Sequence, residues 1–379
     1  MYCNTNSNDV LATVQAIQAL GAKCRRCGDY ILVTPGPAPV CTVVNCGECA
    51  TTARMVLPIA GAMGVDTTIT GGGNLPNRPF APLCSAMEQN GCQLTGQSLP
   101  IHTAGQLQPG VYRLPGNVSS QFISGLLFAL PLLKGDSCIQ LTTPLQSAGY
   151  VQMSIQVLSQ FGIRIHPQQN GYLVPGNQQY ISAGSYTPEG DWSNAAFWLC
   201  AGALGGPVGV TGLDPHSAQG DSVLPQLLAK FGAKVVWQGN ILQVQGGRLV
   251  GCCIDVRNIP DLVPALAICA ACAKGTTRFE GAGRLRIKEC DRIAGIQQAL
   301  QALGASVTVQ GDNIVVVGSP ALGGGKASAM GDHRIAMLLA VLASGCKGDS
   351  CIIGAEAVKK SDPNFFEQFT GLGGTYHVI

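Results

Sequence analysis

The sequence predicts an α/β protein of two domains, built from six repeats of about 70 residues of which the first is incomplete. Three observations carry this prediction. A helix-like stretch that ends in glycine and precedes a strand-like stretch recurs along the chain, a second apolar pattern recurs out of phase with it, and 379 residues suit two domains. The repeat is too long for a solenoid unit, so each copy is expected to be a small α/β module.

The first pattern appears in segments such as QAIQALGAKC, IQVLSQFGIRI and QQALQALGASV, where a helix with one apolar stripe leads into an alternating strand. Its glycines are 69 to 72 residues apart: Gly21, Gly91, Gly162, Gly232, Gly304 and Gly373. This regular spacing indicates internal repetition of one module.

The second pattern is a helix of small apolar residues that ends in glycine before a short strand, as in AGAMGVDTTIT and ACAKGTTRFEG. Helices that are apolar on nearly all sides, such as SSQFISGLLFALPLL, are expected inside a domain, and striped helices such as DRIAGIQQALQALG on its flank. Each module is therefore predicted to run strand, buried helix, strand, surface helix and hairpin.

The second pattern occurs five times and the first six times, so the first module is expected to lack its first half. The chain is then N-terminally truncated, with about 50 more residues expected before Gly21. The alternative is an atypical terminal repeat. Three modules in each domain place the boundary after the third hairpin, which gives domains of residues 1–188 and 189–379.

Composition excludes several classes of protein. Charged residues make up 12% of the chain and the net charge is +2, which argues against a disordered tail and against a nucleic-acid partner. The longest apolar stretches fall short of the ~18 residues that span a bilayer, so no membrane partner is expected. Seventeen cysteines without a secretory signal indicate a reducing, cytoplasmic location. No metal is expected, although the C-x-x-C pairs leave a structural zinc as an alternative.

Charged residues cluster in one segment of this charge-poor chain. Residues 284–292, RLRIKECDR, hold six charges. Glu289 and Asp291 suit a solvated helix start, but Lys288 and Arg292 there oppose the helix dipole. The favoured interpretation is an anion-binding site.

Polar groups also begin several apolar helices. Ser119, Ser120 and Gln121 open one helix, and Arg334 opens another directly after Asp332-His333. Asp261 follows Ile259-Pro260, where an ordinary N-cap is the alternative to a functional role. Arg78 is expected at a further helix start, and Lys360 just before the next. Helix N-termini joined by guanidinium groups predict a small substrate with several negative charges.

These stretches resemble the 5-enolpyruvylshikimate-3-phosphate synthase family. The resemblance runs through NCGECATTAR, NRPFAPL, NVSSQFISGLL, EGDWSNAA, IPDLVPALA, LRIKECDRI, GDHRIAM and KKSDPNFF, in family order and spacing. It implies two inside-out α/β domains of three modules each. It also implies transfer of the enolpyruvyl group of phosphoenolpyruvate to the 5-hydroxyl of shikimate 3-phosphate, with release of phosphate, by a cytoplasmic enzyme that needs no cofactor and is a monomer when full length.

The resemblance also implies roles for individual residues. Asp261 matches the base that takes the hydroxyl proton, Glu289 matches the acid that protonates the methylene carbon, and Lys288 matches a residue beside the hydroxyl. The residues that match the shikimate 3-phosphate site, besides Asp261 and Lys288, are Ser119, Ser120, Gln121 and Ser147. Those that match the phosphoenolpyruvate site are Ala50, Arg78, Gln121, Arg292, Arg334 and Lys360.

Three departures from the family pattern matter. Ala50 stands where the family has glycine, with Glu48 where some relatives have Asn, and Pro76 stands where the family often has Arg. The family's opening Leu-Pro-Gly-Ser-Lys-Ser stretch, whose Lys contacts both substrates, has no counterpart. A non-catalytic or split remnant that binds shikimate 3-phosphate is therefore one alternative. The other is the related transferase that acts on UDP-N-acetylglucosamine, although this transferase lacks the Ser-Ser-Gln-Phe and Lys-Glu-x-Asp-Arg patterns.

Overall fold

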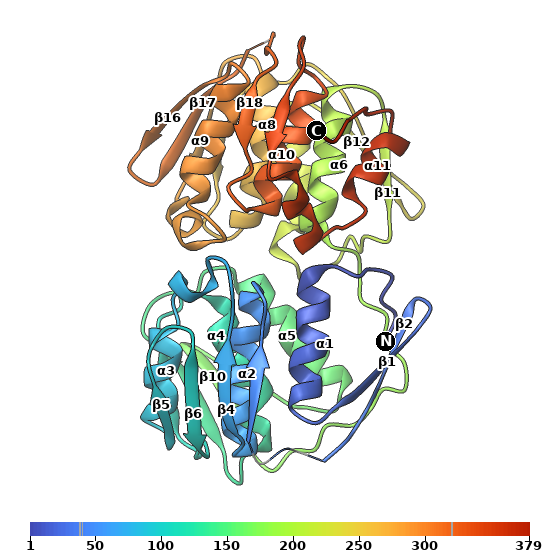
Figure 1. The fold of residues 1–379 in the computed structure, drawn as a ribbon. Coiled ribbons are helices and arrows are strands. Elements are labelled where there is room, and N and C mark those ends of the chain that lie inside the picture. Colours follow the sequence, from blue (N-terminus) through green and yellow to red (C-terminus); the bar gives the residue numbers. More distant parts are fainter. Residues whose placement is uncertain (38, 40, 320) are drawn as a thin grey trace. The chain divides into compact units, whose positions relative to one another are not determined.

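The computed structural model describes residues 1–37, 39, 41–319 and 321–379, and it divides into two compact units, Met1–Pro188 (unit 1) and Glu189–Ile379 (unit 2) (Figure 1). Each unit has its own hydrophobic core. The α/β fold class predicted from the sequence is confirmed, and the order of elements follows the predicted module in full in three modules.

Two modules of unit 1 have the full predicted order. The first contains β3 (Cys41–Asn45), α2 (Ala50–Met63), β4 (Asp66–Thr70), α3 (Ala81–Glu88), β5 (Cys92–Thr95) and β6 (Ile101–Gly105). The second contains β7 (Val111–Leu114), α4 (Ser120–Ala129), β8 (Ser137–Leu141), α5 (Ala148–Gln160), β9 (His166–Gln168) and β10 (Gly171–Val174). Their sheets have the orders β3-β4-β6-β5 and β7-β8-β10-β9, in which the first pair is parallel and the others antiparallel.

The chain before β3 forms the second half of a module. It contains α1 (Asn8–Ala19) and a hairpin of β1 (Lys23–Cys27) and β2 (Tyr30–Thr34). Residues 1–3 lie along β2, where the backbones of Met1 and Ile31 exchange hydrogen bonds of 2.9 and 3.0 Å. The surface helix and hairpin predicted for this segment are therefore present.

Unit 2 has the full pattern only in its middle module: within residues 189–319 and 321–379 the first module lacks its opening strand, and the last lacks its hairpin, so the strand predicted after Gly373 is wrong. Its first module contains α6 (Trp192–Leu204), β11 (Val208–Thr211), α7 (Leu224–Phe231), β12 (Lys234–Gln238) and β13 (Ile241–Gln245). The next contains β14 (Cys253–Asp255), α8 (Val263–Cys272), β15 (Thr276–Glu280), α9 (Arg292–Ala302), β16 (Ser306–Gln310) and β17 (Asn313–Val317). The last contains β18 (Lys326–Ser328), α10 (His333–Ala343), β19 (Cys351–Ile353) and α11 (Phe365–Gly371). The sheets have the orders β11-β13-β12, β14-β15-β17-β16 and β18-β19.

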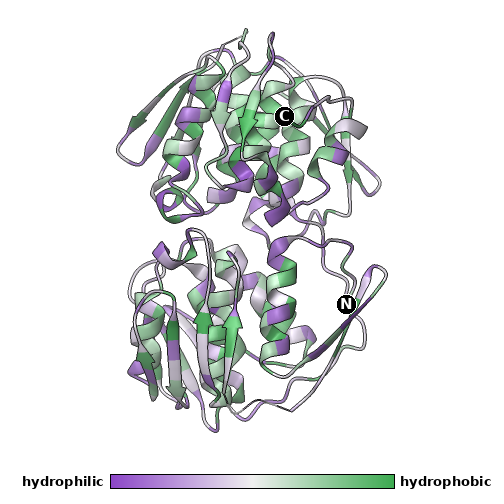
Figure 2. Ribbon diagram, in the orientation of Figure 1, coloured by the Kyte–Doolittle hydropathy of each residue, from purple (hydrophilic) through white to green (hydrophobic). Residues whose placement is uncertain are grey.

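Each unit is built inside out, because its most apolar helices lie within and its sheets outside. In unit 2, helices α6, α8 and α10 pack on one another, and every residue from Val263 to Ala271 of α8 is buried. In unit 1, α2 and α4 pack together, and α2 also contacts β4 and β6. Figure 2 shows hydrophobic residues on these helices and on the strands that cover them. A helix that is apolar all round is stable only where neighbours cover every side.

The six glycines that mark the repeat share one backbone conformation. Their φ angles lie between 81° and 102°. At Gly232, which ends α7, the backbone N–H donates to the carbonyl groups of Leu228 and Ala229. A helix commonly ends in this left-handed conformation, which glycine adopts without steric cost. The spacing of these glycines therefore gives the distance between the ends of successive surface helices.

The helix start expected at Arg78 is wrong. Arg78 follows the 3₁₀ turn η1 (Leu75–Asn77) with φ −80° and ψ 149°, and α3 begins only at Ala81. The cause is Pro79, because a residue before proline is driven into extended conformation. Lys360 lies at the end of the 3₁₀ turn η6 (Ala355–Lys360), and α11 begins at Phe365.

Candidate active site

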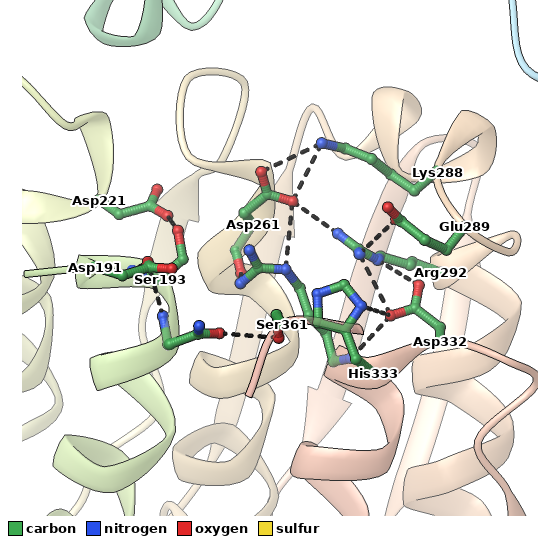
Figure 3. Close-up of polar contacts among 12 residues, drawn as sticks. Asp191, Ser193, Asp221, Asp261, Lys288, Glu289, Arg292, Asp332, His333 and Ser361 are labelled. Atoms are coloured by element: carbon green, nitrogen blue, oxygen red, sulfur yellow. Dashed lines mark hydrogen bonds and ion pairs between the residues drawn. The ribbon is translucent and has the colours of Figure 1, made fainter. Parts of the chain in front are cut away.

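Arg292, the first residue of α9, is the centre of a charged cluster in unit 2. Its side chain is 1% exposed, and its Nε donates to Asp332 Oδ2 at 2.6 Å. Nη1 donates to Asp261 Oδ1 at 2.7 Å and Nη2 to Glu289 Oε2 at 2.6 Å. One guanidinium thus joins three carboxylates, and with Lys288 these residues form the Arg292 cluster (Figure 3).

The charge of Arg292 is strongly stabilised in this setting. Burial lowers the pKa of Arg292, but Asp332, Glu289 and Asp261 outweigh burial and raise this pKa well above its ordinary value. Removing one partner of a buried ion pair typically costs about 3–5 kcal/mol, because the other charge stays buried without compensation. The cluster is therefore a fixed arrangement of charges.

Asp261 lies within the 3₁₀ turn η4 (Pro260–Leu262), and the N-cap positions of η4 and α8 are held by Ile259 and Leu262, so the N-cap interpretation is wrong. Its carboxylate instead accepts from Lys288 Nζ at 3.1 and 3.3 Å. Burial raises the pKa of Asp261, but Lys288, Arg334 and Arg292 outweigh burial and hold this pKa well below its ordinary value. Asp261 is therefore a carboxylate, the form that accepts a proton.

Lys288 follows the 3₁₀ turn η5 (Gly283–Ile287), and its side chain is 17% exposed. Burial lowers the pKa of Lys288 to about 8, against the opposing effect of Asp261. Its ammonium group therefore titrates near neutral pH, unlike an ordinary surface lysine.

Local helix caps hold the two arginines in place. Asp291 caps α9 by accepting from the backbone N–H groups of Ile293 and Ala294 at 3.0 and 3.2 Å. Asp332, fully buried, caps α10 by accepting from the N–H of Arg334 at 2.8 Å. Each arginine lies within two residues of its cap, so the chain direction is fixed where the guanidinium begins.

Arg334 lies beside the cluster, and Lys360 is a buried cation of the same unit. Arg334 Nη1 donates to the backbone oxygen of Asp261 at 3.2 Å, and its Nε lies 3.7 Å from Asp261 Oδ1. Lys360 is 6% exposed and belongs to η6, which packs against α10. By contrast Arg286 pairs with Asp291 at 3.1 Å in an exposed ion pair, where the interpretation as a solvated helix start is correct.

A second polar group, in unit 1, is organised by Arg54 of α2. Arg54 is buried, and its Nη1 donates to Gln121 Oε1 at 2.9 Å and to Ser119 Oγ at 3.4 Å. Its guanidinium lies 5.3 and 5.1 Å from the ring centres of Phe80 and Phe122. Stacking on aromatic rings and hydrogen bonding together fix the side chain.

Three of the predicted residues of unit 1 lie at the starts of its buried helices α2 and α4, and a fourth precedes the surface helix α5. Ser119 is the N-cap of α4 and accepts from the N–H of Gln121 at 3.3 Å, and Ser120 is the first residue of this helix. Ser147 precedes α5 in left-handed conformation with its side chain buried, and Ala50 is the buried first residue of α2. Arg78 is 8% exposed.

The structure thus brings together Asp261, Lys288, Glu289 and Arg292 in one unit, and Ser119 with Gln121 in the other. Sequence reasoning missed Arg54, although a lone arginine within an apolar helix was a signal. It also treated Asp332 only as part of a helix start, because the partner Arg292 is 40 positions away.

Among residues 1–37, 39, 41–319 and 321–379, no group of three or more His, Cys, Asp or Glu side chains is arranged to hold a metal ion. One C-x-x-C thiol has a different role, since Cys49 Sγ accepts from the N–H of Thr52 at 3.5 Å at the start of α2. No helix in this part of the chain is both long enough and apolar enough to cross a membrane.

Comparison with known proteins agrees with this geometry. Residues 5–369 match the family model of EPSP synthase (3-phosphoshikimate 1-carboxyvinyltransferase). The chain is 39% identical to a 3-phosphoshikimate 1-carboxyvinyltransferase of Clostridium kluyveri, over 97% of this chain and 87% of the relative. It is 38% identical to the enzyme of the same name from Methanocorpusculum labreanum, over 96% and 88%.

Solved structures show the same likeness. The EPSP synthase of Acinetobacter baumannii superimposes with a TM-score of 0.77 at 25% identity, covering 97% of this chain and 88% of the other. The enolpyruvyl transferase NikO from Streptomyces tendae, at 18% identity and a TM-score of 0.73, shares the fold. With a family match that spans nearly its whole length and relatives close to 40% identical, the chain belongs to the EPSP synthase family.

Proposed function

We propose that this chain transfers the enolpyruvyl group of phosphoenolpyruvate to the 5-hydroxyl of shikimate 3-phosphate and releases phosphate. The observation that carries the proposal is the Arg292 cluster, where a carboxylate held in its charged form lies 3.1 Å from a lysine ammonium and shares a guanidinium with a second carboxyl group. Acid–base chemistry on an anionic substrate needs these groups together.

In the proposed reaction, Asp261 takes the proton of the 5-hydroxyl while that oxygen bonds to C2 of phosphoenolpyruvate, and Glu289 gives a proton to C3. Glu289 then removes a proton from the new methyl group as the C2–O bond to phosphate breaks. Phosphate carries away the electron pair of that bond, and the proton held on Asp261 leaves with it. Lys288, beside Asp261, stabilises the negative charge that develops on the attacking oxygen.

Glu289 has to leave Arg292 before it can act as an acid, because a positively charged neighbour favours the ionised carboxylate. A guanidinium has five N–H donors, and Arg292 makes four hydrogen bonds, to Asp332, Asp261 and Glu289. An anionic phosphoenolpyruvate competes with Glu289 for these donors. Binding of phosphoenolpyruvate and separation of Glu289 from Arg292 then occur in one step.

The remaining residues are proposed to bind the substrates. Hydroxyl and amide groups at helix starts suit the phosphate and ring of shikimate 3-phosphate. Those residues are Ser119, Ser120, Gln121 and Ser147. Guanidinium and ammonium groups suit the phosphate and carboxylate of phosphoenolpyruvate. The set for this substrate is Ala50, Arg78, Gln121, Arg292, Arg334 and Lys360.

A phosphate-release assay with both substrates tests the proposal. Asp261→Asn and Glu289→Gln should each lower turnover by about 10²–10⁴-fold, the usual effect of losing a positioned base or acid. Asp349→Asn, at an exposed aspartate of unit 2, is the matched control and should keep full activity.

Two outcomes would overturn the proposal. One is near-normal phosphate release by both variants. The other is calorimetric binding of shikimate 3-phosphate by the wild type without any release of phosphate, the behaviour of a non-catalytic protein. UDP-N-acetylglucosamine offered as the acceptor should give no release.

We also propose that the protein works in the cytoplasm and is a monomer when full length. Support comes from the thiols, since Cys27 and Cys253 are both free and exposed and would oxidise in a secretory compartment. Gel filtration at several concentrations tests the monomer, and an elution volume that shifts with concentration would contradict it.

A further inference from the structure

A buried carboxyl group outside the Arg292 cluster lies at the start of α6. Asp221, in the 3₁₀ turn η3 (Gly220–Val223), is fully buried and accepts a hydrogen bond from the hydroxyl of Ser193 (Figure 3). The neighbouring Gln219 accepts from the N–H of Trp192 at 3.0 Å and donates to the carbonyl oxygen of Gly190 at 2.8 Å. Two side chains, Asp221 in η3 and Gln219 at its N-cap, thus hold the first residues of α6.

Asp221 faces more negative than positive charge. Asp191 at the N-cap of α6 and Asp261 in η4 both repel an ionised Asp221, and Arg334 of α10 attracts it. Arg334 is shared, because it also donates to the backbone of Asp261. Burial together with Asp261 raises the pKa of Asp221 to about 7, although Ser193 and Arg334 act in the opposite direction.

We propose that Asp221 is a positioning residue that holds the start of α6 as a neutral carboxyl group and, on ionising, weakens the binding of anionic substrate to the Arg292 cluster. The second half of this proposal rests on the proposed function. A neutral carboxyl group keeps the hydrogen bond to Ser193 without adding charge beside Asp261. An ionised one adds a negative charge to a site that must attract phosphoenolpyruvate.

The first test measures Tm against pH for the wild type and Asp221→Asn, which keeps the shape and a hydrogen-bonding oxygen. A carboxyl group whose pKa is raised on folding contributes stability that is complete below pH 3.8 and is lost as pH rises to about 7. The Tm of the wild type should therefore fall relative to the variant by several degrees between pH 4 and pH 7, and no further above that. Asp349→Asn is the control, and the difference between its Tm and that of the wild type should stay the same over this pH range.

A second variant should shift the pH at which Tm decreases in a direction that a purely structural role does not predict. The Ser193 hydroxyl stabilises the carboxylate, so Ser193→Ala should move the pH of the Tm decrease upward. A downward move, or a difference between wild type and Asp221→Asn that does not change with pH, would overturn the proposal.

The third measurement is KM for phosphoenolpyruvate from pH 6 to 8.5. The ratio of wild-type KM to that of Asp221→Asn should rise on the order of threefold, the effect of one added negative charge that a partly aqueous site screens. kcat should change much less than KM. A ratio that does not change with pH would overturn the substrate-repulsion half. Failure of the proposed function itself is distinguishable, because the wild type would then release no phosphate at any pH.

Discussion

Replacing Arg54 should destabilise unit 1 and weaken its hold on substrate. In Arg54→Leu, Gln121 Oε1 and the Pro79 carbonyl oxygen each lose a donor that lies 2.9 Å away. A buried acceptor left without its donor costs about 1–3 kcal/mol, and the loss of cation–π contact with Phe80 and Phe122 adds about 1 kcal/mol. Removing a buried guanidinium from its desolvated site recovers part of this, so we expect a net loss of about 3 kcal/mol.

The distribution of aromatic residues makes this loss measurable within one unit. All three tryptophans, Trp192, Trp198 and Trp237, belong to unit 2. In a urea titration, tryptophan fluorescence follows unit 2, whereas far-ultraviolet circular dichroism follows both units. Arg54→Leu should therefore leave the fluorescence midpoint nearly unchanged and shift part of the circular dichroism change to lower urea concentration. Arg54→Lys, which keeps the charge without the planar fork, should lose about half as much.

A matched control and a functional assay complete the test. Arg164→Leu removes an exposed arginine of unit 1 and should change stability by less than about 0.5 kcal/mol. Under the proposed function, Arg54→Lys should raise KM for shikimate 3-phosphate by about tenfold through the loosened Gln121, equivalent to roughly 1.4 kcal/mol. Equal shifts of both unfolding signals, or an unchanged midpoint in Arg54→Leu, would refute the reasoning.

Three further predictions concern unit 2. Since the pKa of Lys288 is about 8, kcat/KM should fall as pH rises through that value. Lys288→Arg should move this alkaline decrease to higher pH by more than one pH unit. If the decrease stays at the same pH in Lys288→Arg, it belongs to another group. Burial lowers the pKa of His333 to about 3, so folding excludes a proton that the unfolded chain binds below pH 6.5, and stability is lost as pH falls from 6.5 towards 3. His333→Gln should flatten this loss in an acid titration of Tm, and an equally steep loss would contradict it. Asp191→Ala removes the cap that accepts from Ser193 and Asn194 and should cost about 1 kcal/mol in a urea titration followed by tryptophan fluorescence, whereas no change would show that the cap is not used.

The helix starts at the candidate site could be predicted from local sequence because helix caps are encoded locally. Ser119, Asp291 and Asp332 cap helices through N–H groups two or three residues away. The same holds for the surface helices, whose ends are marked by glycines in left-handed conformation. The helix start predicted from local sequence at Arg78 is wrong, because the following proline favours extended conformation there.

The sequence alone determined the module, its order of elements and the number of repeats, since apolar periodicity and glycine positions act over ten to twenty residues. Tertiary structure decided which charges meet. Arg292 contacts Asp261 from 31 positions away and Asp332 from 40, and Arg54 contacts Gln121 from 67. These pairs form because the fold brings helices from different modules close together, and a buried guanidinium is stable only where carboxylates or carbonyl groups compensate for its lost hydration. No local pattern specifies that partner, so the ionic network and the buried Asp221 become visible only in the folded chain.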